Sequence, residues 1–323
     1  MVAVVRIHST GGPEVMQLES VTLEPPGSGM VTVENRAIGL NFIDTYHRSG
    51  LYPLPLPSGI GMEGAGVVTA VGEDTHWRVG DRVAYCSAGF GSYAQALNLP
   101  GARLVEIPAG ISFDIAAAAM LKGQTAEYLI QRTYPLQAGE TCLFHAAAGG
   151  VGLIFGQWAR SLGATVIGTV GSHEKGELAL RHGYDHVINY RQDNVLDRVL
   201  EITQGEKLPV VYDGVGSDTF SDSLDCLRPR GLMVSFGNAS GAPAPLDLQL
   251  LAGKGSLFVT RPTLISYTAD TLELRQSAKD LFDRIADGRI TIEINQRYAL
   301  KDIQQAHRDL EARLTTGSTI IEP

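Results

Sequence analysis

The strongest local signal in the sequence is His145-Ala-Ala-Ala-Gly-Gly-Val-Gly152. It follows an apolar, strand-like run that begins at Thr141, and it opens a run with helical spacing. A tight strand-to-helix turn points backbone N–H groups and the positive helix terminus at a pyrophosphate. In the corresponding fingerprint Gly152 takes the third glycine position, Gly149 the second, and Ala147 replaces the first. The stretch therefore predicts a dinucleotide site, and a tight turn without a ligand is the alternative.

Strand-like runs alternate with helical stretches beyond this turn. We expect strands at 141–145, 165–170, 186–189, 210–213, 232–236 and 256–260, and helices at 151–162, 174–182, 194–203, 218–227 and 246–252. Strands that alternate with crossover helices predict an α/β fold with a parallel, doubly wound Rossmann sheet.

The first hundred residues have a different pattern, with short alternating segments separated by turn clusters, which indicates antiparallel β structure. After residue 262 we expect a helix at 270–286, a short strand, a helix near 302–313 and a strand at 318–321. If these last elements return to the first domain, the parallel sheet is an insertion. We therefore expect a mainly antiparallel β domain at 1–122 and 263–323, and a nucleotide-binding domain at 123–262.

Composition excludes several classes of protein. The chain has 323 residues, 44% of them hydrophobic and 19% charged, with 26 basic and 35 acidic side chains and a net charge of −9. This balance argues against binding nucleic acid or an anionic membrane. No apolar run reaches the roughly 18 residues that a membrane span needs, and the start of the chain resembles a first strand more than a signal peptide. We expect a cytoplasmic protein with its three cysteines reduced.

The end of the second predicted strand distinguishes the two nicotinamide cofactors, because an acidic side chain there accepts from the NAD ribose and repels a 2′-phosphate. This chain has Gly171, Ser172 and Lys175, which suit a phosphate, although Glu174 is close. We expect NADP(H). Lys175 as a solvated helix residue is the alternative, and Tyr190, after the third strand, is a stacking candidate or a half-buried tyrosine.

Several motifs together resemble one family. Gly59-Ile-Gly-Met-Glu-Gly-Ala-Gly-Val-Val68 joins Asn41-Phe-Ile-Asp-Thr-Tyr46, the turn at 145–152 and Val234-Ser-Phe-Gly-Asn238. In their order along the chain, these motifs resemble the medium-chain dehydrogenase/reductase superfamily, and more narrowly its zinc-free quinone oxidoreductases related to zeta-crystallin. The resemblance covers essentially the whole chain. It implies a GroES-like catalytic domain, NADPH as cofactor and a homodimer.

The resemblance also shows which zinc ligands are missing. Where zinc-dependent relatives have a cysteine, this region has Asn41 and Asp44, and Met62 replaces the histidine before Glu63. The cysteine-rich lobe of a structural zinc is absent. A tetrahedral zinc site needs several converging nitrogen or sulfur ligands, so zinc-assisted alcohol oxidation is improbable and no metal is expected. A quinone or another conjugated carbonyl can accept a hydride with less Lewis-acid help.

The family's site residues fall on this chain as follows. Asn41, Asp44 and Tyr46 are implied to line a cleft near the nicotinamide, with Tyr52 at its edge, and Tyr46 is the expected hydrogen-bond donor to the substrate oxygen. The alternative is that Asn41 and Asp44 cap a helix and that Tyr46 is a wall residue.

The implied cofactor contacts lie elsewhere in the chain. Thr125 and Tyr128 are expected to begin the helix that enters the nucleotide domain, and Arg313 either reaches the 2′-phosphate or is a surface arginine. His145 is expected to be a structural residue and not a catalytic acid or base. Arg261, after the last parallel strand, is a weaker candidate for a residue that lines the cleft. The full expected set is Asn41, Tyr46, Thr125, Tyr128, Gly149, Gly150, Val151, Gly152, Gly171, Ser172, Lys175, Tyr190, Phe236, Gly237, Asn238 and Arg313.

The leading hypothesis is a metal-free, NADPH-dependent quinone reductase. An NADPH-dependent reductase of enal or enone double bonds and a non-catalytic NADPH-binding protein are the alternatives. A homodimer is expected to form through the apolar edge strand at 256–260, since a bare sheet edge invites pairing.

Overall fold

The computed structural model describes all 323 residues, and the chain forms two compact units. Unit 1 contains Met1–Gln124, Tyr267–Asp287 and Ile292–Pro323. Unit 2 contains Thr125–Ser266 and Gly288–Thr291.

Unit 2 is built on a six-stranded parallel sheet with the strand order β11-β10-β9-β12-β13-β14. This confirms the predicted doubly wound sheet, although the fifth strand begins five residues earlier than expected. The strands are β9 (Thr141–Phe144), β10 (Thr165–Val170), β11 (His186–Asn189), β12 (Leu208–Asp213), β13 (Leu227–Ser235) and β14 (Phe258–Thr260).

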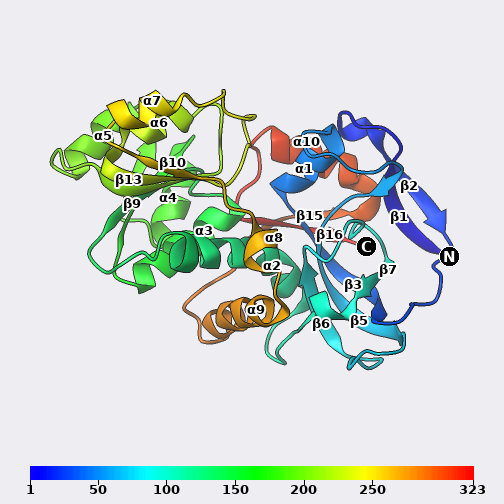
Figure 1. Cartoon of the computed structure of the whole chain (residues 1–323). Helices are drawn as coiled ribbons and strands as arrows, with labels where there is room; N and C mark the ends of the chain where they lie inside the picture. The colour runs from blue at the N-terminus through cyan, green and yellow to red at the C-terminus, as the bar shows by residue number, and fades with distance from the viewer. The chain divides into compact units, whose positions relative to one another are not determined.

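Helices cover both faces of this sheet (Figure 1). The order reverses at β9, so right-handed crossovers place α3 and α4 on one face and α5, α6 and α7 on the other. The helices are α3 (Gly150–Ser161), α4 (His173–Arg181), α5 (Val195–Ile202), α6 (Phe220–Asp225) and α7 (Leu248–Gly253), followed by α8 (Leu264–Tyr267). The strand ends near the reversal point form the edge where α/β sheets bind ligands.

Unit 1 contains two sheets. A three-stranded sheet has the order β2-β1-β4, and a larger one has the order β15-β16-β3-β5-β6-β8, with β7 also paired to β3. Only β15 and β16 pair in parallel there. The strands are β1 (Val2–Ile7), β2 (Met16–Val21), β3 (Met30–Leu40), β4 (Ser58–Gly59), β5 (Glu63–Val71), β6 (Arg82–Cys86), β7 (Ala96–Pro100), β8 (Val105–Glu106), β15 (Ile294–Ala299) and β16 (Ser318–Glu322).

The helices of unit 1 include the C-terminal ones that the sequence predicted. They are α1 (Phe42–Ser49), α9 (Thr271–Ala286) and α10 (Ile303–Glu311), with 3-10 turns at Pro13–Val15, Gly101–Arg103 and Leu300–Asp302. The final strand β16 pairs with β3, so the last residues of the chain belong to the same large sheet as residues 30–40. The core around this pairing includes Ile38, Leu40, Tyr93, Ile303 and Ile321.

Helix α2 (Phe113–Tyr128) runs from unit 1 into unit 2 and continues as a π-helical turn at Leu129–Thr133. Thr125 and Tyr128 therefore lie in its last turn. The prediction that they begin a helix was wrong. Ala116 to Ala119 are all fully buried, and most polar residues of α2, such as Lys122, are buried as well. The helix therefore has no solvent-exposed polar face, and its sequence carries no 3.6-residue pattern to reveal it.

Candidate active site and nucleotide-binding turn

The glycine-rich turn of unit 2 is built around a residue in the left-handed conformation. Ala146 has φ +58°, and its carbonyl accepts a hydrogen bond from the Gly149 N–H at 3.0 Å. Gly149 is the N-cap residue of α3. A methyl group built on Gly152 would lie 2.5 and 2.7 Å from the carbonyl oxygens of Ala147 and Ala146. The third glycine thus lets the helix pack closely on the turn, as dinucleotide sites require.

The missing first glycine of the fingerprint has a local explanation. Ala147 is fully buried and has no positive φ; the left-handed position is one residue earlier, at Ala146. A Cβ on Gly168 in β10 would lie 2.6 Å from the Ala147 methyl group. Gly168 therefore provides the space that the methyl group of Ala147 occupies.

The predicted phosphate-binding residues meet at the carboxyl ends of β10 and β11. Ser172 caps α4, and its hydroxyl accepts a hydrogen bond from the Lys175 N–H at 3.3 Å. A Cβ on Gly171 would lie 2.6 Å from the Tyr190 hydroxyl and 3.5 Å from Nε of Arg191. The structure thus brings Gly171, Tyr190 and Lys175 to one edge and adds Arg191. Sequence reasoning missed this cation, although it directly follows Tyr190.

The predicted contacts after β13 are held in place by an arginine. Nη1 of Arg261 donates hydrogen bonds to the carbonyl oxygens of Ser235 and Gly237 at 3.0 and 2.9 Å. The Phe236 ring packs on Phe144, with ring centroids 5.6 Å apart. Arg261 therefore holds the backbone of the segment 235–238 at Ser235 and Gly237.

In unit 1, helix α1 starts at a buried polar cluster. Asn41 is the N-cap residue, and its side-chain amide donates a hydrogen bond to the Glu63 carboxylate at 2.8 Å. Glu63 is fully buried and also accepts from the Lys122 ammonium at 3.2 Å and from the Leu121 N–H at 2.6 Å. Because a carboxylate can only accept, the Asn41 amide turns its NH2 group toward Glu63.

Asp44 was expected to line a cleft near the nicotinamide or, alternatively, to cap a helix, and the structure shows the cap. Asp44 is fully buried, and its Oδ2 accepts hydrogen bonds from the Asn41 N–H at 2.9 Å and from the Tyr93 hydroxyl at 2.7 Å. Its other oxygen has no hydrogen-bond partner. The carboxylate thus completes the N-terminal cap of α1 from inside unit 1, because the third residue of the helix can reach back to the N-cap N–H.

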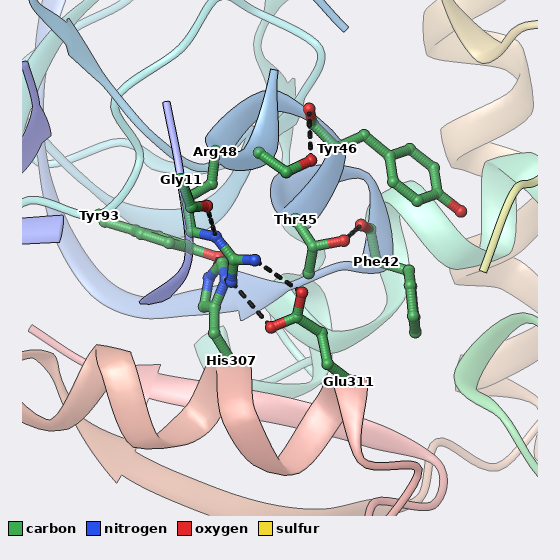
Figure 2. Close-up of polar contacts among 9 residues, drawn as sticks. Gly11, Phe42, Thr45, Tyr46, Arg48, Tyr93, His307 and Glu311 are labelled. Carbon is green, nitrogen blue, oxygen red and sulfur yellow. Dashed lines mark hydrogen bonds and ion pairs between the residues drawn. The ribbon is translucent and has the colours of Figure 1, made fainter. Parts of the chain in front are cut away.

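A chain of buried polar groups connects Asp44 to α10. Figure 2 shows the part of this chain formed by Tyr93, His307, Arg48 and Glu311. The Tyr93 hydroxyl contacts Nε2 of His307 at 3.0 Å, and Nδ1 of His307 contacts Nη1 of Arg48 at 3.1 Å. Arg48 also pairs in a bidentate manner with Glu311, at 2.9 and 2.6 Å. Because arginine can only donate, His307 carries its proton on Nε2 and Tyr93 donates to Asp44. Helix α1 is therefore anchored to α10 along its buried side.

Burial raises the pKa of Asp44 from 3.8 to about 7, because it removes the charged carboxylate from bulk solvent. The folded protein then binds more protons than the unfolded chain between these two values, so this group's contribution to stability decreases as the pH rises. We expect the free energy of unfolding of the wild type, relative to Asp44→Asn, to fall by about 2 kcal/mol between pH 5.5 and pH 8. Urea unfolding of both proteins at each pH measures it, and a difference independent of pH would contradict the raised pKa.

The aromatic residues of α1 lie on a different side of the helix. Figure 2 shows Tyr46 pointing away from Arg48, Tyr93 and His307. The Tyr46 ring packs on Tyr52 in an edge-on arrangement, with centroids 5.2 Å apart. The structure therefore brings Tyr46 and Tyr52 together and separates them from the Asp44 carboxylate.

The remaining predicted positions have clear local settings. Arg313 follows α10 in unit 1 with φ +60°. His145 is 1% exposed and contacts the hydroxyl groups of Thr169 and Ser223 at 3.0 and 2.9 Å. Burial lowers the pKa of His145, so its imidazole is neutral. This agrees with the expected structural role. The three cysteines are buried and free.

The donor set near α1 does not fit a zinc ion. Met62 precedes Glu63, Asn41 is held by that carboxylate, and no three His, Cys, Asp or Glu side chains converge anywhere in the chain. The cation that neutralises Glu63 is instead the Lys122 ammonium. No helix is long and apolar enough to cross a bilayer.

The two units correspond to known domain families. A model described as "Zinc-binding dehydrogenase" matches residues 150–278, and one described as "Alcohol dehydrogenase GroES-like domain" matches residues 27–109. A Rossmann sheet joined to a GroES-like β domain is the architecture of the medium-chain dehydrogenases/reductases.

Similar proteins match this chain over its whole length. A quinone oxidoreductase of Pseudomonas aeruginosa is 55% identical over 99% of both chains. The crystal structure of Escherichia coli quinone oxidoreductase complexed with NADPH is 50% identical, covers 99% of this chain and 100% of that one, and superposes with a TM-score of 0.98. A 2-haloacrylate reductase from a Burkholderia species is 42% identical over 100% of this chain and 99% of its own. The chain belongs to the zinc-free quinone oxidoreductases of the medium-chain dehydrogenase/reductase superfamily.

Proposed function

We propose that this protein is an NADPH-dependent quinone reductase that works without a metal. The observation that carries the proposal is the intact nucleotide turn at 146–152 in a chain whose α1 cluster holds a lysine–glutamate pair in place of metal ligands. The Escherichia coli relative, crystallised with NADPH, supports the cofactor. The names of the relatives at 50–55% identity support the substrate class.

The protein supplies position and hydrogen bonds in this reaction. Bound NADPH supplies a hydride, and with one proton from solvent a quinone becomes a hydroquinone while NADP⁺ remains. Gly149, Gly150, Val151 and Gly152 bind the pyrophosphate through the backbone N–H groups at the start of α3. Tyr46 donates a hydrogen bond to the quinone oxygen that gains negative charge.

The remaining assignments belong to the same proposal. We assign the catalytic role to the domain expected at residues 1–122 and 263–323, and NADP binding to the domain expected at residues 123–262. The short segment Gly288–Thr291, which lies within the first of these domains, packs in unit 2. Asn41 and Tyr46 contact both cofactor and substrate, and Tyr52 borders the substrate. The other cofactor contacts are Thr125, Tyr128, Gly171, Ser172, Lys175, Tyr190, Phe236, Gly237, Asn238 and Arg313.

Oxidation of NADPH and, in parallel, NADH with 1,4-benzoquinone tests the function after exhaustive treatment with EDTA. We expect rapid turnover that EDTA does not change and that prefers NADPH. Turnover with 2-haloacrylate or an enone but not with benzoquinone would identify a double-bond reductase. Tight NADPH binding without turnover of any acceptor would identify a non-catalytic protein.

Replacing Tyr46 by Phe tests the proposed donor. Loss of one hydrogen bond to the developing oxyanion should lower kcat/KM for benzoquinone by about 10–100-fold, while the Kd for NADPH changes little. Tyr298→Phe is the matched control, because it removes a hydroxyl bonded to Asp309 in unit 1. An unchanged kcat/KM in Tyr46→Phe would rule out this donor.

Replacing Lys175 by Ala tests the proposed preference for the 2′-phosphate. The side chain sits in the first turn of α4, close to the strand edge that Arg191 also approaches. Loss of one cation should reduce the ratio of kcat/KM for NADPH to that for NADH by about tenfold, because only NADPH carries the phosphate. Lys301→Ala, at an exposed site in unit 1, should leave the ratio unchanged. An equal decrease in kcat/KM for NADPH and for NADH would contradict the assignment of Lys175 to the 2′-phosphate.

A cytoplasmic homodimer completes the proposal. Strand β14 lies at the edge of the parallel sheet, where Phe258 is 60% exposed, and neighbouring α7 exposes Leu248 at 72%. A bare apolar edge of this kind favours pairing with a second copy. A monomeric mass in sedimentation would overturn the homodimer.

A further inference from the structure

Beneath the nucleotide turn of unit 2 lies a buried chain of hydrogen bonds that begins at Asp213. This carboxylate is fully buried, and each of its oxygens is occupied by two donors. Oδ1 accepts from the N–H groups of Val215 and Gly216 at 2.8 and 3.0 Å, and Oδ2 accepts from the hydroxyl groups of Thr219 and Ser223 at 2.7 and 2.9 Å.

These contacts fix the direction of every further bond. Because the Ser223 proton points at Asp213, the Ser223 oxygen accepts from Nε2 of His145 at 2.9 Å. Nδ1 of this neutral imidazole then accepts from the Thr169 hydroxyl at 3.0 Å. The lone pairs of the Thr169 oxygen remain available to the N–H of Ala146, 3.4 Å away.

The chain ends at the one residue of the turn that is in an unfavourable conformation. Ala146 has φ +58°, a region that residues with a Cβ rarely adopt without support from their surroundings. Its neighbours are tied to strands on either side. The His145 N–H donates to the Tyr212 carbonyl, and the Ala147 N–H donates to the Thr169 carbonyl, both at 3.0 Å.

We propose that Ser223, His145 and Thr169 are positioning residues that hold Ala146 in its left-handed conformation and thereby keep the turn ready for the pyrophosphate. None of the three needs to touch the cofactor; they act through the backbone of the turn. This inference rests on the proposed binding of NADPH. It assigns His145 a role in cofactor affinity, where burial alone indicates only a packing residue.

A double-mutant cycle with Ala146 separates this role from general stability. Thr169→Val keeps the shape of the side chain and removes both hydrogen bonds, so we expect the Kd for NADPH, measured by fluorescence titration, to rise about tenfold. Glycine adopts positive φ without support, so in an Ala146→Gly background Thr169→Val should raise the Kd by less than about threefold. Thr203→Val is the matched control, because the Thr203 hydroxyl forms hydrogen bonds only with the backbone of Val199 and Lys207. The Kd of this variant for NADPH should equal that of the wild type.

Two outcomes would overturn the inference while leaving the cofactor assignment intact. One is a Kd for NADPH in Thr169→Val equal to that of the wild type. The other is the same fold-increase in both backgrounds, which would show that the hydroxyl acts independently of Ala146. Failure of the wild type itself to bind NADPH would overturn both the inference and the proposed function. In the cofactor-free protein, nitrogen-15 NMR should show His145 protonated on Nε2, and protonation on Nδ1 would contradict the direction of the chain.

Discussion

Replacing Glu63 by Gln is expected to lower the free energy of unfolding by about 3–5 kcal/mol, because it leaves the Lys122 ammonium buried without its counter-charge. Lys122 is 6% exposed and Glu63 is fully buried, so water cannot replace the lost carboxylate. The same change weakens the hydrogen bonds that Glu63 accepts from the Asn41 amide and the Leu121 N–H. Urea unfolding at pH 7 measures the loss.

An exposed ion pair provides the matched control. Lys279 and Asp283 pair on α9 with side chains 66% and 53% exposed, so Asp283→Asn should change stability by less than about 0.5 kcal/mol. The double variant Glu63→Gln, Lys122→Met removes both charges and should recover much of the loss, since a buried pair costs desolvation that an apolar side chain avoids. A Glu63→Gln protein as stable as the wild type would show that Lys122 does not need this carboxylate.

The parallel sheet could be predicted from the sequence because its signals are local. Short apolar runs such as Thr141–Phe144 and Thr165–Val170 are bounded by glycines and helix caps, and the nucleotide turn lies between two such elements. Helix α2 could not be predicted in the same way. Its alanine-rich middle is buried on all sides, and a helix without a solvent-exposed polar face has no periodic pattern.

The buried polar clusters escaped sequence reasoning for a different reason. Arg48 and His307 are 259 residues apart, and Glu63 and Lys122 are 59 apart, so only the fold brings these pairs together. The family resemblance implied that Asp44 lines a cleft near the nicotinamide, with a helix cap as the alternative. The spacing of Asp44 from Asn41 suits that cap, and only the contact with Tyr93 shows that the carboxylate faces inward.

Replacing Gly149 by Ala is expected to raise the Kd for NADPH at least about a hundredfold, a loss of about 2.7 kcal/mol of binding free energy. The second glycine of a dinucleotide turn lets the backbone approach the pyrophosphate, so a methyl group there occupies the space the phosphate needs. Within the protein this methyl group would meet only the Ala146 carbonyl oxygen, at 3.2 Å. The Tm of the cofactor-free protein should therefore fall only slightly.

Gly152→Ala is the informative contrast, because its methyl group clashes with the protein itself. It would lie 2.5 Å from the Ala147 carbonyl oxygen and 2.7 Å from that of Ala146, so the turn must shift before any cofactor binds. We expect a loss of stability of about 2 kcal/mol in the cofactor-free protein together with weaker NADPH binding. Gly110→Ala, whose added methyl group would meet nothing within 4 Å, should change neither quantity. Thermal unfolding without cofactor and fluorescence titration with NADPH give both values. If Gly149→Ala bound NADPH as tightly as the wild type, the pyrophosphate would have to lie away from this turn, and the assignment of residues 149–152 would be wrong.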